Sequence, residues 1–141
     1  SLTNWAQTKS IRLEKRCQPG LPPVMIDPNR IAQVVTNLMG NAVKFTPQQG
    51  CVTVETSLSV EGKGIEVAVS DTGPGIAPED LEKVFEKFYQ AKNRAATDIS
   101  GTGIGLAIVR EIVELHGGTV RALSEQGKGA RFIFTIPITA G

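Results

Sequence analysis

The most regular hydrophobic pattern in the chain lies between residues 28 and 45. Apolar side chains recur there every three or four positions, which predicts an amphipathic helix. Asp27 and Pro28 suit its start, because aspartate caps the first free N–H groups and proline fits the first turn. The apolar positions of this helix are Ile31, Val34, Val35, Leu38, Met39 and Ala42.

Strand-like alternation occurs in several other segments. Ile11 and Leu13 predict a short half-buried strand. Residues 52–58 and 65–69 alternate on either side of a turn at 61–64, which predicts a hairpin. A last pair of strands is expected at 119–124 and 131–136, joined by residues 126–129.

Two further helices are expected. One begins at Pro78 and buries Leu81, Val84, Phe85 and Phe88. The other follows Gly105 and ends at His116, with Gly117 placed for a left-handed cap. Residues 89–100 show no period, which predicts a mobile loop. Together these elements predict an α+β sandwich in which helices pack on one face of a mixed, mainly antiparallel sheet.

Composition limits the class of protein. A chain of 141 residues that is 40% apolar fits a single domain over residues 1–141, with residues 1–9 as a linker from an upstream domain. The 15 basic and 14 acidic residues nearly cancel, so neither nucleic acid nor a membrane surface is an expected partner. Cys17 and Cys51 lack metal-ligand or disulfide-framework spacing, so we expect a cytoplasmic location. Because the chain begins with Ser1, we expect it to be part of a longer protein.

A polar stripe follows the first helix. Its members are Arg30, Gln33, Asn37, Asn41 and Lys44. Asparagine is a poor helix former, so a stripe that contains two of them favours a functional reason over a merely solvated face. The Asn41 amide oxygen suits Mg²⁺, which takes few protein oxygens and fills its octahedron with water and phosphate. Lys44 and Asn37 are candidate phosphate contacts.

Asp71 stands at a predicted strand end, directly before Thr72 and Gly73. A carboxylate there suits the exocyclic amine of adenine, which guanine replaces with an oxygen. The competing interpretation is an ordinary Asx turn.

Alternating glycines at residues 101–105 precede a helix, so backbone N–H groups there suit phosphate oxygens. The spacing matches neither a Rossmann fingerprint nor a P-loop. Lys92 and Arg94 in the predicted loop either contact phosphate or are solvated. His116, the only histidine, is interpreted as a helix cap and not as a phosphate acceptor.

Four ordered segments resemble the motifs of sensor histidine kinase catalytic domains, within the GHKL ATPase superfamily. Residues 37–47 resemble the N box, 71–75 the first glycine box, 85–88 the F box and 101–105 the second glycine box. The resemblance covers about residues 11–137 and implies a Bergerat fold. One position departs from the pattern, since Gln90 stands where many members have arginine.

The resemblance implies binding of ATP and Mg²⁺, with Asn41 as the metal ligand and Asp71 on adenine. The implied nucleotide-binding residues are Asn37, Asn41, Lys44, Asp71, Gly73, Gly75, Ile76, Lys87, Arg94, Gly101, Thr102, Gly103, Gly105 and Leu106. Residues 90–100 would form the lid. The implied reaction is transfer of the ATP γ-phosphate to a histidine on a separate dimerisation domain, with a response regulator downstream, and no phosphoacceptor histidine is recognised here.

Other functions stay open at this point. Clamp ATPases of the same superfamily carry a glutamate four residues before the metal asparagine, where this chain has Asn37. An amide cannot accept a proton at neutral pH, which favours transfer over hydrolysis. An anti-sigma-factor serine kinase, or a pseudo-kinase that binds nucleotide only to support an interaction, are the remaining alternatives.

Overall fold

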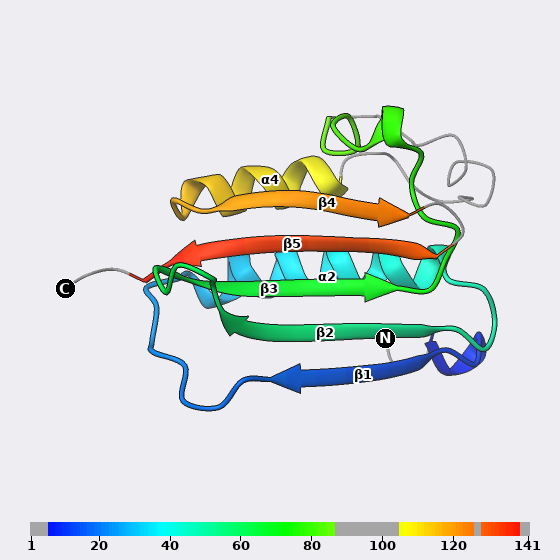
Figure 1. Cartoon of the computed structure of the whole chain (residues 1–141), viewed down its shortest axis with the longest axis horizontal. Coiled ribbons are helices and arrows are strands. Elements are labelled where there is room, and N and C mark those ends of the chain that lie inside the picture. Colours follow the sequence, from blue (N-terminus) through cyan, green and yellow to red (C-terminus); the bar gives the residue numbers. More distant parts are fainter. Residues whose placement is uncertain (1–5, 87–104, 126–127, 139–141) are drawn as a thin grey trace.

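The computed structural model describes residues 6–86, 105–125 and 128–138. Five strands form one sheet in the order β1-β2-β3-β5-β4. Their bounds are Arg12–Cys17 (β1), Cys51–Leu58 (β2), Gly64–Asp71 (β3), Thr119–Glu125 (β4) and Gly129–Pro137 (β5). Strand β1 pairs with β2 in parallel and the remaining neighbours are antiparallel. The predicted mixed, mainly antiparallel sheet is therefore confirmed (Figure 1).

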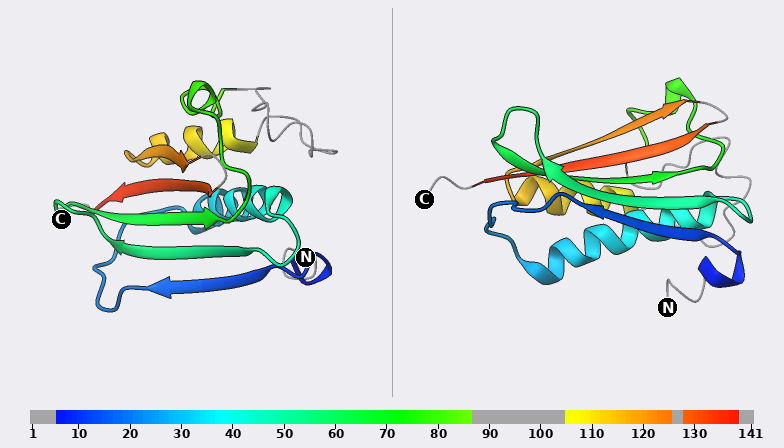
Figure 2. Two further views of the ribbon diagram at one scale, coloured as in Figure 1. Left: turned by 45° about the vertical axis from the view of Figure 1, so that its right-hand side comes forward. Right: turned by 60° about the horizontal axis from the view of Figure 1, so that its bottom comes forward.

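Two α-helices, α2 (Pro28–Phe45) and α4 (Gly105–Leu115), cover one face of this sheet. Figure 2 shows both helices on the same side of the sheet, and no helix of the described residues covers the other face. The helices also pack against each other. This two-layer arrangement confirms the predicted sandwich, because an amphipathic helix and a half-apolar sheet must bury their apolar sides together.

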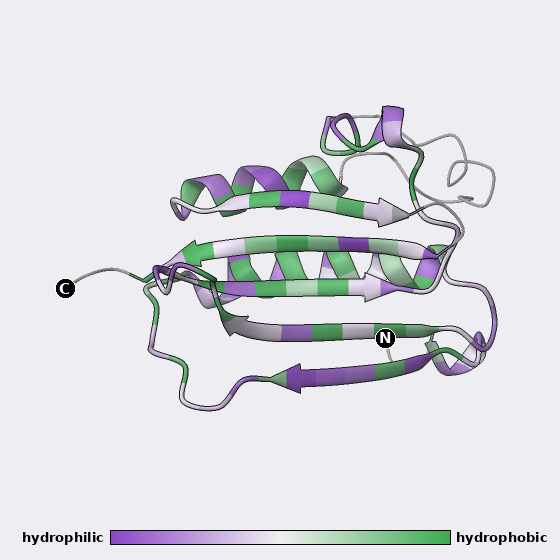
Figure 3. Ribbon diagram, viewed as in Figure 1, coloured by the Kyte–Doolittle hydropathy of each residue, from purple (hydrophilic) through white to green (hydrophobic). Residues whose placement is uncertain are grey.

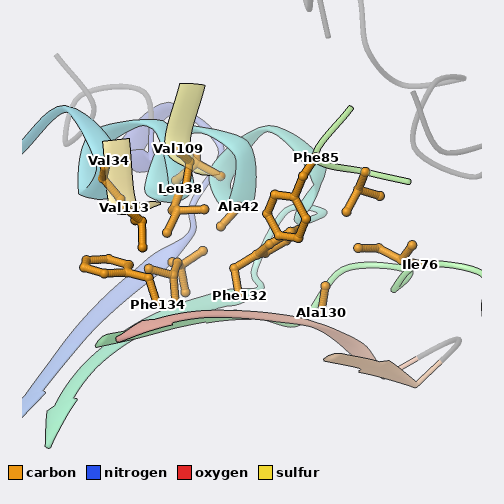
Figure 4. Close-up of a cluster of buried hydrophobic side chains, with 14 of the residues drawn as sticks. Val34, Leu38, Ala42, Ile76, Phe85, Val109, Val113, Ala130, Phe132 and Phe134 are labelled. Atoms are coloured by element: carbon orange, nitrogen blue, oxygen red, sulfur yellow. The ribbon is translucent and has the colours of Figure 1, made fainter. Parts of the chain in front are cut away.

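The core lies between the helices and the sheet. Phe132 and Phe134 of β5 meet Leu38 of α2 and Val109 and Val113 of α4 (Figure 4). Phe85, from the segment after β3, stacks edge-on against Phe132 with ring centroids 6.0 Å apart. This cluster holds α2 against the sheet.

The outermost strand β1 is strongly charged. Glu14 lies between two arginines, with its carboxylate oxygens 3.3 Å from Arg12 Nε and 3.8 Å from Arg16 Nη2. Figure 3 shows this strand as predominantly hydrophilic. Leu13 is its partly buried contribution to the core.

The predicted caps are confirmed. The Asp27 carboxylate accepts hydrogen bonds from the N–H groups of Asn29 and Arg30, at 3.0 and 3.3 Å. Gly117 has φ +78°, the left-handed conformation expected after the last turn of α4. The start of α2 and the end of α4 could therefore both be predicted from the neighbouring residues in the sequence.

The prediction of a helix that begins at Pro78 is wrong for residues 78–86, the part of that segment that the structure describes. A three-residue 3-10 helix, Pro78–Asp80, is followed by turns up to Glu86. The Asp80 carbonyl accepts the N–H groups of both Lys83 and Val84, so the hydrogen bonds do not settle into a continuous α-helical ladder. Val84 and Phe85 are nevertheless buried, as the pattern predicted.

The segment before β1 packs on the domain. Residues 6–8 form a helical turn, and Ala6 is 1% exposed within the core. Ile11 N–H donates to the Ala6 carbonyl, and Gln49 N–H donates to the Ser10 carbonyl. Whether residues 1–9 serve as a linker stays a prediction, but residues 6–9 have a fixed place beside the end of α2.

Candidate functional site

Asp71 is held in one orientation at the end of β3. It is 5% exposed, and its Oδ1 accepts hydrogen bonds from the N–H groups of Gly73, at 2.9 Å, and Ala130, at 3.2 Å. The first bond is the Asx turn that the sequence left as the competing interpretation. The second, which comes from β5, ties the carboxylate to the centre of the sheet. The structure therefore places Asp71 in a turn that also fixes the direction of its carboxylate.

The turn after Asp71 lies directly against the end of α2. A Cβ on Gly73 would stand 2.8 Å from the Phe45 carbonyl oxygen, so only glycine permits this approach. Cys51 N–H donates to Thr72 Oγ1 at 3.0 Å, and Thr72 N–H donates to the Cys51 carbonyl. The approach of Gly73 joins the predicted adenine-binding turn to the last residue of the helix that carries the candidate phosphate and metal residues, and the two hydrogen bonds join the turn to the start of β2.

Gly129 was predicted only as part of the connection at residues 126–129. In the structure it packs against the backbone of Asp71, on the side of the Asp71 turn away from α2. Its φ is +108°, and an added Cβ would overlap the backbone carbonyl of Asp71. Ser124 Oγ accepts the Ile76 N–H at 2.6 Å and donates to the Gly129 carbonyl at 3.1 Å. A glycine in a predicted turn was the only sequence signal, because the approach to Asp71 joins residues far apart in the chain.

Four further predicted nucleotide-binding residues lie within the described parts of the chain, in or next to the two glycine boxes. Gly75 has φ +80°, which an L side chain rarely adopts. Ile76 is 1% exposed and belongs to the core, below the surface of the turn. Gly105 opens α4 and is exposed, whereas Leu106 is half-buried against the core.

Asn37, Asn41 and Lys44 lie one helical turn apart on α2 and are all half-buried, so this part of the polar stripe is not simply solvated surface, whereas Arg30 at its start is exposed. The Nδ2 atom of Asn41 is buried and has no hydrogen-bond partner among the described residues. A buried amide without a partner is costly, and such groups mark strain or a ligand. Lys44 Nζ lies 5.6 Å from the centroid of the Phe45 ring. An N–H donor without a partner, one helical turn from a lysine, suits a phosphate oxygen, and the oxygen of the same amide is the atom that could hold a metal.

The last turn of α2 is capped by residues that the sequence analysis missed. Thr46 donates to the Ala42 carbonyl through both its backbone N–H, at 3.0 Å, and Oγ1, at 2.6 Å. Lys9 Nζ donates to the next two carbonyls, those of Val43 at 2.8 Å and Lys44 at 3.0 Å. A lysine 34 residues before its partner carries no local sequence signal.

His116 has the capping role that the sequence predicted. Its Nε2 accepts the Asp27 N–H at 3.1 Å, so the proton lies on Nδ1, which donates to the Ile112 carbonyl at 2.8 Å. Both ring nitrogens are therefore engaged in joining the end of α4 to the start of α2.

Several predicted site residues lie outside the described residues. They are Lys87, Arg94, Gly101, Thr102 and Gly103, together with Phe88, Gln90, Lys92 and the predicted loop at 89–100. The structure thus brings together Asp71, Gly73, Gly75 and the C-terminal half of α2, and it places Gly105 and Leu106 at the start of α4. Among the described helices, none combines the length and apolar character needed to cross a bilayer.

A mixed sheet covered on one face by two helices, with an asparagine-bearing helix beside an Asp-Thr-Gly turn, is the architecture of a GHKL-type ATP-binding domain. Residues 26–140 match the family model described as histidine kinase-, DNA gyrase B- and HSP90-like ATPase. The chain belongs to this family. Within it, the chain corresponds to the catalytic ATP-binding domain of sensor histidine kinases.

Relatives and solved structures agree with this assignment. The sensor histidine kinase ZraS of Escherichia coli O157:H7 is 40% identical over 133 residues, which cover 94% of this chain and 27% of ZraS. The chain thus spans about a quarter of the length of this relative. A mycobacterial sensor histidine kinase, MprB, superimposes with a TM-score of 0.83 at 29% identity, covering 96% of this chain and 90% of the MprB chain.

Two further solved structures include bound molecules. Full-length ShkA in complex with AMPPNP superimposes with a TM-score of 0.83 at 34% identity and covers 99% of this chain and 28% of ShkA. Histidine kinase ThkA in complex with the response regulator protein TrrA gives a TM-score of 0.78 at 28% identity, over 98% of this chain and 37% of that chain.

Proposed function

We propose that this chain binds ATP with Mg²⁺ and donates the γ-phosphate to a histidine on a separate dimerisation domain of the same kinase. The observation that carries the proposal is the buried Asn41 Nδ2 group, which has no hydrogen-bond partner among the described residues. It lies one helical turn from Lys44, on the helix whose last residue, Phe45, meets the Asp71 turn. ATP binding is the property of the family, and the AMPPNP complex of ShkA supports it.

Each end of the nucleotide has its own candidate residues. Asp71 would accept the exocyclic amine of adenine with a carboxylate already oriented by Gly73 and Ala130. Asn41 would hold Mg²⁺ through its amide oxygen, while Asn37 and Lys44 would contact phosphate oxygens. When bound, the metal neutralises charge on the phosphates. The proposed nucleotide contacts of Gly73, Gly75, Ile76, Gly105 and Leu106, and of Lys87, Arg94, Gly101, Thr102 and Gly103, complete the site.

The side chain of Asn37 favours transfer of the γ-phosphate to a partner group over hydrolysis of ATP by water. An amide at this position cannot take a proton from water, so the described residues of α2 offer no general base there. Phosphoryl transfer needs mainly positioning and charge stabilisation, which a partner histidine brought to the site would complete. The partners we propose are the dimerisation domain and, downstream, a response regulator, as the ThkA–TrrA complex supports. We propose a cytoplasmic location for this domain.

The first test is the variant Asn41→Ala. Loss of the metal ligand should abolish the Mg²⁺-dependent part of ATP affinity and leave the circular dichroism spectrum unchanged, because Asn41 is not part of the core cluster. Isothermal titration of ATP with and without Mg²⁺ measures this. Asn29→Ala, which removes the same group from the exposed first turn of α2, is the matched control and should bind as the unaltered chain does.

A second measurement separates transfer from the alternatives. The chain is incubated with Mg–ATP and a histidine kinase dimerisation domain supplied in trans, and acid-labile phosphate on that domain is measured. Phosphorylated histidine supports the proposal. Rapid phosphate release without transfer would indicate a hydrolase. Phosphoserine on an added protein substrate of an anti-sigma-factor serine kinase would indicate that kinase, and tight binding without any transfer would indicate a pseudo-kinase.

A further inference from the structure

Lys9 makes a long-range contact with the helix that carries the proposed phosphate and metal residues. Its Nζ donates to the carbonyl oxygens of Val43, at 2.8 Å, and Lys44, at 3.0 Å. The final carbonyls of any helix lack partners within the helix. Lys9 therefore completes a cap in which Thr46 already satisfies the carbonyl of Ala42.

The ammonium is itself fixed in place. Ala6 is buried in the core, Ser10 N–H donates to the Gln7 carbonyl, and Ile11 N–H donates to the Ala6 carbonyl. Ser10 has φ +58°, in the left-handed region that non-glycine residues rarely adopt. This backbone arrangement turns the chain from the helical turn at residues 6–8 into β1, and leaves Lys9 beside the end of α2.

The charge has the favourable sign for this place. Carbonyl groups at a helix C-terminus carry partial negative charge, and a cation stabilises them. Partial burial lowers the pKa of Lys9 below its ordinary value, because the ammonium loses water. Its hydrogen bonds to two carbonyls are therefore made where water is partly excluded, which makes them stronger than at an open surface.

We propose that Lys9 is a positioning residue for nucleotide binding: by holding the carbonyls of Val43 and Lys44, it fixes the last turn of α2 and so the phosphate-contacting side of the site. Helix ends fray when they lack such partners. Lys44 belongs to the clamped turn, and Asn41 lies one turn before it. The inference rests on the proposed function, since it assigns Lys9 to the metal and phosphate end of that site.

The test compares Lys9→Met, which keeps the aliphatic stem but removes charge and donors, with the unaltered chain. We expect the dissociation constant for Mg–ATP to rise about tenfold, the equivalent of about 1.4 kcal/mol. Affinity for adenosine alone should change less than about twofold, because Asp71 is held by Gly73 and Ala130 and not by Lys9. Hydrogen exchange without nucleotide should be faster at the amides of residues 43–46.

Matched variants separate positioning from general stability. Lys9→Arg, which retains charge and donors, should restore affinity to within about threefold of the unaltered value. Lys63→Met removes the same charge from the exposed β2–β3 turn and should bind Mg–ATP normally. If Lys9→Met does not fold, Lys9→Gln takes its place, because glutamine keeps an N–H donor without the charge. Its affinity for Mg–ATP should fall by less than about tenfold, and its affinity for adenosine should again change little.

The outcomes are distinct. Unchanged Mg–ATP affinity in a folded Lys9→Met or Lys9→Gln variant overturns the positioning role, and so does an equal loss for Mg–ATP and adenosine. If the unaltered chain fails to bind Mg–ATP, the proposed function fails instead. In that case unchanged hydrogen exchange at residues 43–46 would also overturn the clamp, whereas faster exchange would support it independently of nucleotide.

Discussion

At the scale of single residues, Asp71 combines an observed structural role with a proposed binding role in one carboxylate. Its Oδ1 accepts two backbone N–H groups, one from its own turn and one from β5. The alternatives that the sequence offered, an Asx turn or an adenine contact, therefore do not exclude each other. The turn supplies the rigid geometry that selective recognition of a base requires.

The variant Asp71→Asn separates these roles. The asparagine side chain retains an oxygen for the Gly73 and Ala130 N–H groups, so the fold should be preserved. It removes the negative charge of the carboxylate proposed to accept a hydrogen bond from the adenine amine. The free energy of ATP binding should therefore become less favourable by about 1 to 3 kcal/mol. Calorimetric titration with ATP and GTP measures the effect. Equal ATP affinity in the two proteins would eliminate the proposed role.

Residue patterns predicted what is determined locally and missed what is determined by contacts across the chain. Asp27 and Gly117 were predicted because a cap depends on a few neighbouring positions. The contact of Lys9 with α2 and that of Gly129 with Asp71 were missed, because nothing near either residue in sequence indicates its partner. The candidate site was thus recognisable from motifs, whereas the contacts around it required the fold.

At the scale of elements, the two ends of α2 have different tasks. The start is fixed by the Asp27 cap and by His116 of the neighbouring helix. The other end carries the proposed site residues and is fixed by Thr46 and Lys9. Pro28 and Asn41 are separated by about 20 Å along the axis, at 1.5 Å per residue. Changes at the start should therefore affect stability without affecting nucleotide affinity.

Asp27→Ala tests this division. Loss of the capping carboxylate should lower the free energy of unfolding by about 0.5 to 2 kcal/mol, as measured by urea denaturation. The dissociation constant for Mg–ATP should stay within about twofold of its normal value, which is the opposite of the pattern expected for Lys9→Met. Asp27→Asn keeps a capping oxygen and should recover most of the stability. A large loss of affinity in folded Asp27→Ala would contradict the division.

Element prediction from sequence failed where propensity and packing disagree. Residues 78–86 carry a helical start signal and helical spacing of apolar residues, yet they form a 3-10 turn and further turns. Burial of Val84 and Phe85 satisfies the apolar pattern without a regular helix. The parallel pairing of β1 with β2 was likewise unpredicted, because alternation reveals a strand but not its neighbour.

At the scale of the whole molecule, the proposed site takes residues from both layers of the sandwich. Asp71 belongs to the sheet, and Asn41 and Lys44 to a helix. A ligand that contacts both layers binds the native state and not the unfolded state, so it stabilises the entire domain. Binding should therefore be visible in global unfolding and not only at the site.

We expect Mg–ATP at about 100 times its dissociation constant to stabilise the chain by about 2.7 kcal/mol. Differential scanning calorimetry should show a midpoint that rises with nucleotide concentration. The Asn41→Ala variant should lose the Mg²⁺-dependent part of that rise, whereas Asn29→Ala should retain it. A midpoint independent of nucleotide in the unaltered chain would argue against native-state binding.

The charged strand β1 has a consequence for how copies of this domain behave toward one another. An outermost strand offers backbone groups that can template growth of the sheet by a neighbouring molecule, and charged side chains are a common natural defence against that aggregation. The row formed by Arg12, Glu14, Lys15 and Arg16 provides this defence along the side of the sheet farthest from β4. If apolar residues replaced these charges, the exposed edge of β1 should pair with the sheet edges of other copies and the domain should aggregate.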